Sequence, residues 1–240
     1  ITMEEILYLY DHYLKEFEAT ITDVLEENKI ILNQTAFYPT SGGQSHDKGT
    51  IRRIVDNKHF EVLNVYKREG KIIHEVDKVG LKKADKIRGI IDWTRRYKHM
   101  RAHTAAHIIS EVIHKETRAL ITGNQIGESK IRIDFSLENF NKEMFKQYIN
   151  AANKIIAQDL PVTIEFLSHE GALQIPEISK LAIGLPESIQ QVRIVKIGNF
   201  DVQADGGTHV KSTKEIGKLI FLNAENKGKN NRRVYVQIEP

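Results

Sequence analysis

Residues 95–115 of the chain read RRYKHMRAHTAAHIISEVIHK. Apolar residues recur here at three- and four-residue intervals, at Ala105, Ile109, Val112 and Ile113. This spacing places them along one stripe of an α-helix. The stretch therefore predicts a long helix, and it separates two parts of the chain that differ in their pattern of apolar residues.

Before this helix, short runs of β-branched and apolar residues alternate with turn residues. Several short strands at such spacing favour a small barrel or a sandwich, and we expect a barrel over residues 1–92. The predicted strands are residues 17–26, 29–32, 50–55, 60–66, 71–76 and 86–91.

After residue 92 the pattern mixes strands with helices. A second helix is predicted at residues 143–158, where it ends before Pro161, and residues 168–186 are ambiguous. The fold class expected is therefore α+β, with the N-terminal barrel followed by an antiparallel sheet and helices over residues 93–240. The strands predicted in this part are residues 131–135, 162–167, 192–197, 219–224 and 233–238.

Composition limits the chemistry that this chain can perform. Hydrophobic residues make up 40% of the 240 residues and charged residues 28%, which is typical of a globular protein. The longest apolar runs are too short to span a bilayer, and no secretory leader is visible, so a cytoplasmic protein is expected. The chain has no cysteine, which excludes disulfides and thiolate nucleophiles. Any metal must therefore be bound by His, Asp, Glu or water.

The formal net charge is only +3, but positive charge is clustered before the first histidine pair. Arg95, Arg96 and Arg101 form one such cluster. Basic clusters can contact the phosphates of a nucleic acid, and a solvated surface is the alternative interpretation. These three arginines are the candidate RNA contacts.

His103 and His107 stand four residues apart on the predicted helix. Residues at this spacing share one helix face, so the two imidazoles are placed to bind one metal ion. Two histidines also occur at this spacing by accident. A metalloprotease of the zincin type is disfavoured, because Thr104 stands where such an enzyme has its catalytic glutamate.

A second candidate element is residues 205–209, which read DGGTH. The glycine pair allows a tight turn, and Asp205 and His209 flank it at a spacing that can close on one ion. An ordinary glycine turn with a capping aspartate is the alternative. Together, three histidines and a carboxylate match zinc, which commonly has three protein ligands and one open position when it is catalytic.

Three motifs in this chain resemble those of a known family. The pattern RxxxMRxHTxxH at residues 96–107 and FDVQADGGTHV at residues 200–210 resemble the two metal motifs of the alanyl-tRNA synthetase editing domain. TAFYPTSGGQ at residues 35–44 resembles the glycine-rich motif of that editing module. The motifs occur in the expected order without an aminoacylation domain before them. The chain is therefore similar to the free-standing alanyl-tRNA trans-editing proteins, the AlaX family, in their medium form.

This resemblance implies an editing-domain-like fold with one zinc ion, and a hydrolase that deacylates mischarged tRNA(Ala). Ser-tRNA(Ala) is the chief substrate expected and Gly-tRNA(Ala) a further one. A pocket for alanine rejects an added hydroxyl by only about a hundredfold, which explains the need for a second, hydrolytic site. The candidate catalytic residues are Gln44, whose amide can orient substrate or water, and Thr35, whose hydroxyl can read that of serine. The alternatives are an ordinary turn residue and an ordinary strand threonine. The candidate substrate contacts are Gly42, Gly43, Gly206, Gly207 and Thr208.

One departure from the family concerns Asp205, where much of the family has cysteine. A carboxylate can bind zinc, so the metal set is His103, His107, His209 and Asp205, or the three histidines with water. Oxygen ligation softens selectivity for zinc over other divalent ions. Two alternatives stay open, a zinc-braced RNA-binding module without catalysis and an editor of another mischarged tRNA, such as one charged by threonyl-tRNA synthetase.

Overall fold

The computed structural model describes residues 5–139, 141–176, 178, 180 and 190–239. The chain divides into two compact units, Ile1–Lys98 and His99–Pro240. The division falls inside helix α1 (Trp93–Thr117), a little beyond the boundary expected from the change of sequence pattern.

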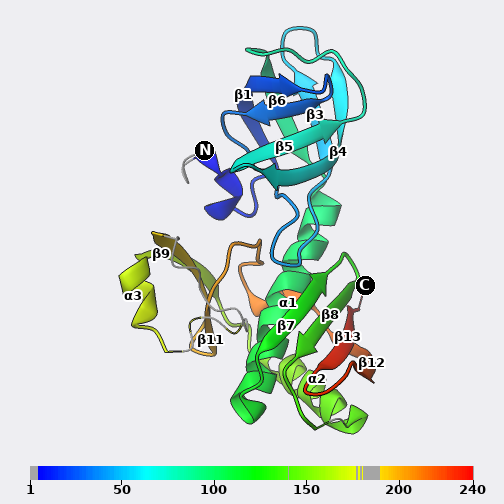
Figure 1. Cartoon of the computed structure of the whole chain (residues 1–240), viewed down its shortest axis with the longest axis vertical. Helices are drawn as coiled ribbons and strands as arrows, with labels where there is room; N and C mark the ends of the chain where they lie inside the picture. The colour runs from blue at the N-terminus through cyan, green and yellow to red at the C-terminus, as the bar shows by residue number, and fades with distance from the viewer. Residues whose placement is uncertain (1–4, 140, 177, 179, 181–189, 240) are drawn as a thin grey trace. The chain divides into compact units, whose positions relative to one another are not determined.

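Unit Ile1–Lys98 contains a closed barrel of six strands in the order β1-β2-β5-β4-β3-β6 (Figure 1). All of its strand pairs are antiparallel, and buried and exposed residues alternate along β1 and β4. This alternation is what a sheet closed around an apolar core requires. The predicted barrel is therefore confirmed. Its strands are β1 (Glu16–Leu25), β2 (Lys29–Leu32), β3 (Gly49–Arg53), β4 (His59–Arg68), β5 (Lys71–Val76) and β6 (Lys86–Ile91).

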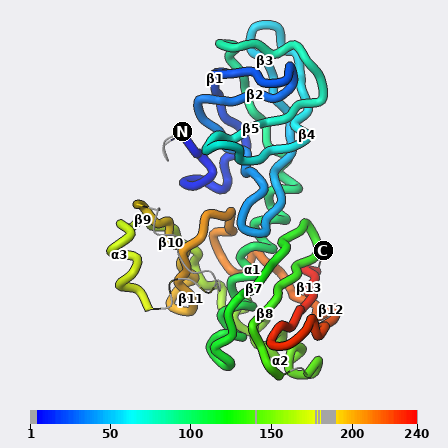
Figure 2. The backbone as a smooth tube through the Cα atoms, in the orientation of Figure 1, coloured from blue at the N-terminus to red at the C-terminus, as the bar shows by residue number. Residues whose placement is uncertain are grey.

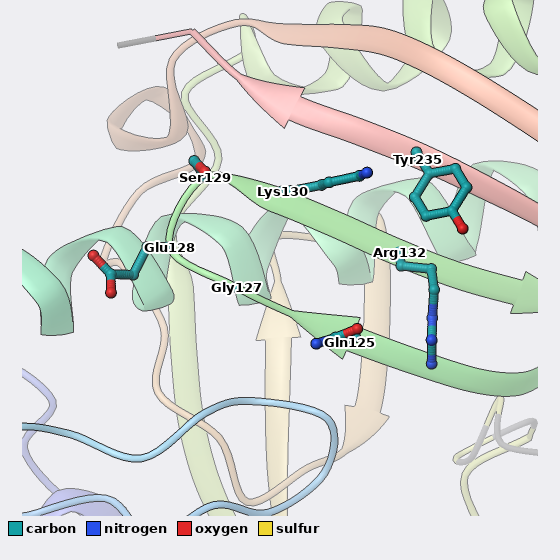
Figure 3. Close-up of a pocket in the computed structure, with 7 residues that line it drawn as sticks. All are labelled: Gln125, Gly127, Glu128, Ser129, Lys130, Arg132 and Tyr235. Carbon is teal, nitrogen blue, oxygen red and sulfur yellow. The ribbon is translucent and has the colours of Figure 1, made fainter. Parts of the chain in front are cut away.

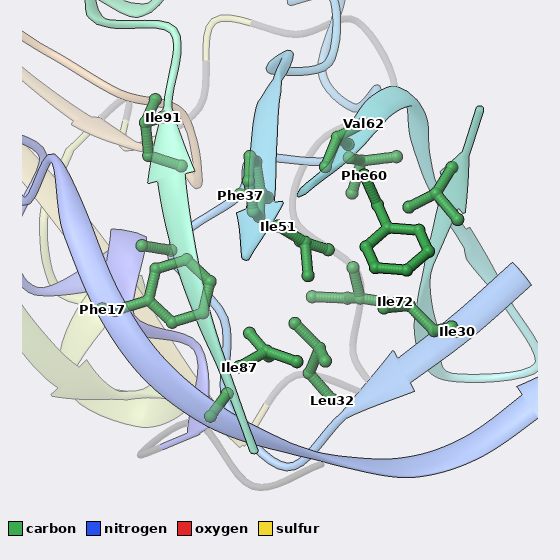
Figure 4. Packing of buried hydrophobic residues seen from close by; sticks show 14 of the residues in the cluster. Phe17, Ile30, Leu32, Phe37, Ile51, Phe60, Val62, Ile72, Ile87 and Ile91 are labelled. Atoms are coloured by element: carbon green, nitrogen blue, oxygen red, sulfur yellow. The ribbon is translucent and has the colours of Figure 1, made fainter. Parts of the chain in front are cut away.

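The barrel encloses its own hydrophobic core, into which side chains from all six strands point (Figure 4). Phe17 on β1 packs there edge-to-face on Phe37, with 5.6 Å between ring centroids. Its partner across the sheet is Gly89, and a Cβ at that glycine would lie 2.4 Å from the Phe17 ring. The glycine in β6 is thus required by the close approach of an aromatic ring.

A polar pair is buried inside this core. His74 is fully buried, and its Nε2 lies 2.8 Å from the Thr35 hydroxyl oxygen. The Nδ1 of His74 lies 3.4 Å from the carbonyl oxygen of Ile30, which only accepts, so Nδ1 carries the proton. Nε2 therefore accepts from the Thr35 hydroxyl, whose oxygen also accepts from the Phe37 amide at 3.1 Å. Burial lowers the pKa of His74 to about 4, against the weaker opposing effect of the Ile30 carbonyl.

Unit His99–Pro240 contains two antiparallel sheets where the sequence predicted one (Figures 1 and 2). A four-stranded sheet has the order β12-β13-β8-β7, and a three-stranded sheet has the order β11-β10-β9. Their strands are β7 (Ile121–Ile126), β8 (Lys130–Phe135), β9 (Val162–Ser168), β10 (Gln191–Ile197), β11 (Asp201–Ala204), β12 (Leu219–Asn226) and β13 (Arg232–Ile238).

Strands β7 and β11 were absent from the sequence prediction. Strand β7 is an edge strand with the sequence ITGNQI, in which only Ile126 is buried. Strand β11 is four residues long. Strand β7 has no alternating apolar run, and β11 alternates but is too short to stand out in the sequence. Both pair with a neighbouring strand that supplies backbone hydrogen-bond partners.

Helix α1 differs from the prediction in how it is buried. Every residue from 102 to 114 is buried, so the helix presents no solvated face over this length and the predicted apolar stripe is only part of its packing surface. Helix α2 (Lys142–Ile156) follows the N-cap Asn141, whose side chain accepts from the Glu143 amide. Of the ambiguous stretch 168–186, residues 169–173 form helix α3 (His169–Leu173), and residues 177, 179 and 181–186 lie outside the described residues.

In the described part of the chain, no helix combines the length and the apolar character needed to cross a membrane.

The buried His74 is expected to make the barrel unit sensitive to acid. Its pKa is depressed in the folded state, so protons bind the unfolded chain more tightly and stability falls as pH drops from about 6.5 towards 4. Between pH 7 and pH 5, His74 should contribute a loss of about 2 kcal/mol in the free energy of unfolding. Urea unfolding followed by the fluorescence of Trp93, the one tryptophan of the chain, measures this loss.

The matched variant is His74→Gln, which keeps a polar side chain but cannot titrate. It should lose correspondingly less stability than the unsubstituted protein over the same pH interval. An equal loss in both proteins would contradict the assignment.

Candidate metal centre and glycine-rich segment

Helix α1 carries two of the candidate metal ligands. His103 and His107 are both nearly fully buried, and their ring centroids lie 5.4 Å apart. The third imidazole, His209, comes from the segment after β11. Its ring centroid lies 4.6 Å from that of His103 and 4.7 Å from that of His107. The two distant stretches of sequence thus converge as predicted.

Asp205 completes this group of four. Its Oδ1 lies 3.3 Å from His103 Nε2 and 3.9 Å from His107 Nε2, and its Oδ2 lies 2.9 Å from His209 Nε2. The potential ligand atoms of the four residues all lie within 4.8 Å of one another. Ligands at 2.0–2.1 Å in a tetrahedral zinc site are about 3.3 Å apart, so these separations match a single ion.

The glycine pair between Asp205 and His209 has two different roles. Gly207 passes so close to His103 that a Cβ on it would lie 2.0 Å from His103 Cε1. A Cβ on Gly206 would meet nothing within 4 Å. The Gly207 amide also donates to Asp205 Oδ2 at 2.6 Å, which holds the carboxylate in place. The close backbone approach expected of this pair is therefore a property of Gly207.

Each of two imidazoles has a polar neighbour at its Nδ1. For His209 it is the buried hydroxyl of Thr104, at 3.1 Å. For His107 it is Asp201, whose Oδ2 lies 3.4 Å away. Carboxylates and hydroxyls in such positions orient metal-binding imidazoles. Sequence reasoning did not single out Thr104 or Asp201 as members of the site, although both stand inside the two quoted motifs.

A buried lysine balances the charge behind Asp201. Lys180 Nζ lies 2.6 Å from Asp201 Oδ1 and 2.9 Å from Glu111 Oε2. Gln203 donates to Asp201 Oδ2 at 2.8 Å. The carboxylate of Asp201 next to His107 is thus held by two groups, Lys180 and Gln203. No sequence motif signals Lys180, because it lies in the stretch that the sequence left ambiguous.

The mutual proximity of these groups shifts their pKa values. Burial lowers the pKa of His107, but the carboxylates of Asp201 and Asp205 outweigh it and raise this pKa to about 9. Burial holds the pKa of His209 well below its usual value, and the neighbouring imidazoles add to the effect. Burial opposes ionisation of Asp205, yet the surrounding histidines hold its pKa well below the usual range. A cation bound by these atoms must displace the proton of His107.

The donor set fits a divalent metal ion. Three imidazole nitrogens and one carboxylate oxygen are all neutral or negative ligands that zinc accepts, and the chain has no thiolate that would compete. The Nδ1 of His107 is buried and lies 3.4 Å from Asp201 Oδ2. Among the described residues it makes no hydrogen bond of good geometry. These four residues are therefore a candidate metal site.

The glycine-rich segment lies in unit Ile1–Lys98 and forms a two-residue turn. Ser41 and Gln44 exchange backbone hydrogen bonds of 3.1 and 2.9 Å, and Gly42 and Gly43 between them have φ of +56° and +84°. Positive φ at both central positions is the type I′ turn, which favours glycine. The side chain of Gln44 is buried. The sequence thus identified a glycine turn, and the positive φ at Gly42 and Gly43 favours glycine at both positions.

The candidate catalytic residue Thr35 lies in the barrel core described above. Its hydroxyl is 2.8 Å from His74 Nε2 and accepts from a backbone amide, and the residue is 2% exposed. A contact between this hydroxyl and a substrate therefore requires the pair with His74 to open. Sequence reasoning gave His74 no role, because a lone histidine in a strand carries no signal of its partner.

The three candidate RNA-binding arginines have different environments. Arg96 is fully buried, where its Nε lies 3.0 Å from both carboxylate oxygens of Asp47 and its Nη1 donates to the His12 carbonyl at 2.9 Å. A contact between Arg96 and a phosphate would break this network. Arg95 and Arg101 are half-buried, and each donates to a backbone carbonyl through Nε, at 3.0 and 2.9 Å.

A surface pocket lies apart from the four candidate ligands, on the polar face of the four-stranded sheet (Figure 3). Across the strands, Arg132 is the register partner of both Gln125 and Tyr235. Lys130 Nζ lies 4.2 Å from the centroid of the Tyr235 ring. The lining contains none of the residues that the sequence proposed for the site.

Comparison with known families supports the resemblance of the motifs. Residues 3–95 match the family described as tRNA synthetases class II (A). Residues 192–235 match the threonyl and alanyl tRNA synthetase second additional domain. The first match covers the barrel and the glycine-rich segment, and the second covers Asp205 and His209 of the candidate metal site.

Curated relatives extend the similarity over almost the whole chain. An alanyl-tRNA editing protein AlaX-M of Methanosarcina acetivorans is 47% identical, with 97% of this chain and 98% of the relative covered. AlaX-M of Saccharolobus solfataricus is 46% identical, with 99% and 100% covered. An alanine–tRNA ligase of Pyrococcus abyssi is 36% identical over 91% of this chain and 24% of the ligase. The chain therefore belongs to the AlaX-M family of alanyl-tRNA editing proteins.

Proposed function

We propose that this protein is a hydrolase that removes a wrong amino acid from tRNA(Ala), and that it uses one zinc ion to do so. Serine is the chief amino acid removed, and glycine is a further one. The observation that carries the proposal is the convergence of His103, His107, His209 and Asp205 on one point. Two of these residues lie in the stretch 192–235 that matches the threonyl and alanyl tRNA synthetase second additional domain. The family relationship supplies the substrate class.

A bound zinc ion supplies positive charge, which can polarise an ester carbonyl or lower the pKa of a water molecule. The protein contributes the geometry of the ligands. Gly207 lets the backbone approach His103, and its amide holds Asp205. Because His103, His107 and His209 are nearly fully buried, bulk water is kept away from most of the ligand set. Electrostatic interactions are stronger in such a site than in water.

Serine preference is proposed on general grounds of discrimination. A site that hydrogen-bonds the hydroxyl of serine leaves polar groups unpaired when alanine binds, and such a site can reject alanine by about 10⁴-fold. Glycine also lacks the hydroxyl, so its removal is proposed from the family relationship and not from this argument. Arg95 and Arg101 are proposed as contacts of the tRNA backbone, since phosphate contacts give affinity without sequence information.

The first expected result concerns the metal. His103→Ala removes one of three imidazoles, so purified protein should contain much less zinc by elemental analysis. Hydrolysis of Ser-tRNA(Ala) should fall by at least about a hundredfold, because a metal contributes several kcal/mol to such reactions. Undiminished activity in the zinc-free variant would exclude a catalytic metal. If the variant loses zinc but the parent protein deacylates no tRNA, the metal is structural and the protein is an RNA-binding module without catalysis.

The control is His59→Ala, because His59 is exposed on the barrel strand β4. This variant should keep both zinc and activity. A panel of Ser-tRNA(Ala), Gly-tRNA(Ala), Ala-tRNA(Ala) and Ser-tRNA(Thr) identifies the substrate. Faster hydrolysis of Ser-tRNA(Thr) than of Ser-tRNA(Ala) would show that the protein edits the product of another synthetase.

The two glycines of the DGGTH segment offer a matched pair. Gly207→Ala introduces a methyl group 2.0 Å from His103 Cε1, so either the loop or the imidazole must move. Zinc affinity, measured by competition with a chelator, should fall by at least about tenfold, as it does when the support of a metal ligand is disturbed. Gly206→Ala meets open space and should bind zinc normally. Equal effects of the two substitutions would contradict the close approach of Gly207.

Gln44 and Thr35 are proposed to act on the substrate rather than on the metal. Gln44→Ala should therefore lower the deacylation rate while zinc content is unchanged. The half-buried Gln34 of the same unit, changed to alanine, is the control. If the Gln44→Ala variant keeps the deacylation rate and the substrate preference of the parent protein, Gln44 has only a structural role in the turn.

For Thr35, the substitution to valine tests whether the hydroxyl reads serine. Such a role changes the ratio of the rates for Ser-tRNA(Ala) and Gly-tRNA(Ala). A role confined to the pair with His74 lowers the free energy of unfolding and leaves that ratio as it was.

A further inference from the structure

The hydroxyl of Thr104 is a junction between helix α1 and the segment that carries His209. Thr104 is fully buried, and its Oγ1 has three polar neighbours. It lies 2.9 Å from the Met100 carbonyl oxygen, 3.2 Å from the Val210 amide and 3.1 Å from His209 Nδ1. These three groups occupy the full hydrogen-bonding capacity of a hydroxyl, which is one donor and two acceptor positions.

The chemistry of two neighbours settles the role of the third. The Met100 carbonyl can only accept, so it takes the single proton of the Thr104 hydroxyl. The Val210 amide can only donate, so it uses one lone pair of the oxygen. The second lone pair remains for His209 Nδ1, which must then carry a proton. His209 therefore carries a proton on Nδ1.

Nε2 then faces Asp205 Oδ2 at 2.9 Å among the other ligand atoms. A carboxylate only accepts, so this position holds either a proton donated by Nε2 or a cation bound by both groups. With the cation in place, the lone pair of His209 is on Nε2. The opposite tautomer would place a proton on Nε2, which cannot bind a cation. We propose that Thr104 is a positioning residue that fixes His209 as the Nδ1-protonated tautomer and thereby makes Nε2 its metal-binding atom. This inference rests on the proposed metal site and assigns a function to the residue that follows His103 on helix α1.

The same hydroxyl also fixes where the His209 segment lies. Because Val210 donates to the oxygen that orients the neighbouring imidazole, backbone and side chain are held by one atom of helix α1. Rotation of the imidazole would break a buried hydrogen bond, and a buried polar group without a partner costs about 1–3 kcal/mol. Thr104 therefore couples the position of the segment to the orientation of its metal ligand.

A spectroscopic test needs no substitution. The full chain, labelled with ¹⁵N in histidine and loaded with Zn²⁺, shows by NMR which ring nitrogen of His209 carries a proton. The inference expects the proton on Nδ1 and the metal on Nε2. A proton on Nε2 with zinc on Nδ1 overturns it.

Substitutions test the same point through metal affinity. Thr104→Val keeps the shape of the side chain but removes the hydroxyl, and the affinity for Zn²⁺ should fall by about 10- to 100-fold in chelator competition. Thr104→Ser restores the hydroxyl and should bind Zn²⁺ close to the parent affinity. Serine and valine variants with the same loss would show that the hydroxyl is not the determinant.

Thr117 provides the matched control on the same helix. Its hydroxyl donates to the Ile113 carbonyl at 2.6 Å and accepts from the Ala119 amide at 3.2 Å, as Thr104 does with Met100 and Val210. Thr117→Val should therefore lower stability without changing Zn²⁺ affinity. An equal loss of affinity in this variant overturns the inference. Failure of the unsubstituted protein to bind Zn²⁺ would count against the proposed metal site itself, which separates the two hypotheses.

Discussion

Three imidazoles and a carboxylate are held together in the interior of one unit, with ligand atoms within 4.8 Å. Packing lone pairs at this density away from water is unfavourable unless a cation or protons lie among them. The raised pKa of His107 and the depressed pKa of Asp205 reflect this constraint. These groups are kept in place by the buried helix α1, by Gly207 and by the ion pair of Asp201 with Lys180.

Support for the ligands comes from residues that are not ligands themselves. Gly207 has no side chain, so the backbone can pass close to His103. Asp201 lies beside His107 and is held there by Lys180. The Thr104 hydroxyl uses its one proton and both lone pairs in hydrogen bonds to Met100, Val210 and His209. Each of these residues acts through geometry, because a metal site depends on the orientation of its ligands as well as on their identity.

In the barrel unit, too, buried polar groups are paired with one another and with the backbone. The Thr35–His74 pair and the Arg96–Asp47 pair are buried, and each is connected to backbone carbonyls or amides. Such networks are favourable only when every member is satisfied. The glycine turn at Gly42 and Gly43 follows from a separate requirement, the positive φ of a type I′ turn.

The sequence alone determined the barrel, the long helix, the spacing of His103 and His107, and the three motifs, because these follow from local periodicity and short-range spacing. Strand β7 lacks such periodicity, and β11 is only four residues long, so both depend on pairing with their neighbours. The second sheet, the burial of Arg96 and the partners of Thr35 and Thr104 were likewise decided by the tertiary structure. Asp47 is 49 positions from Arg96, and His209 is 105 from Thr104, so no local pattern can report these hydrogen bonds.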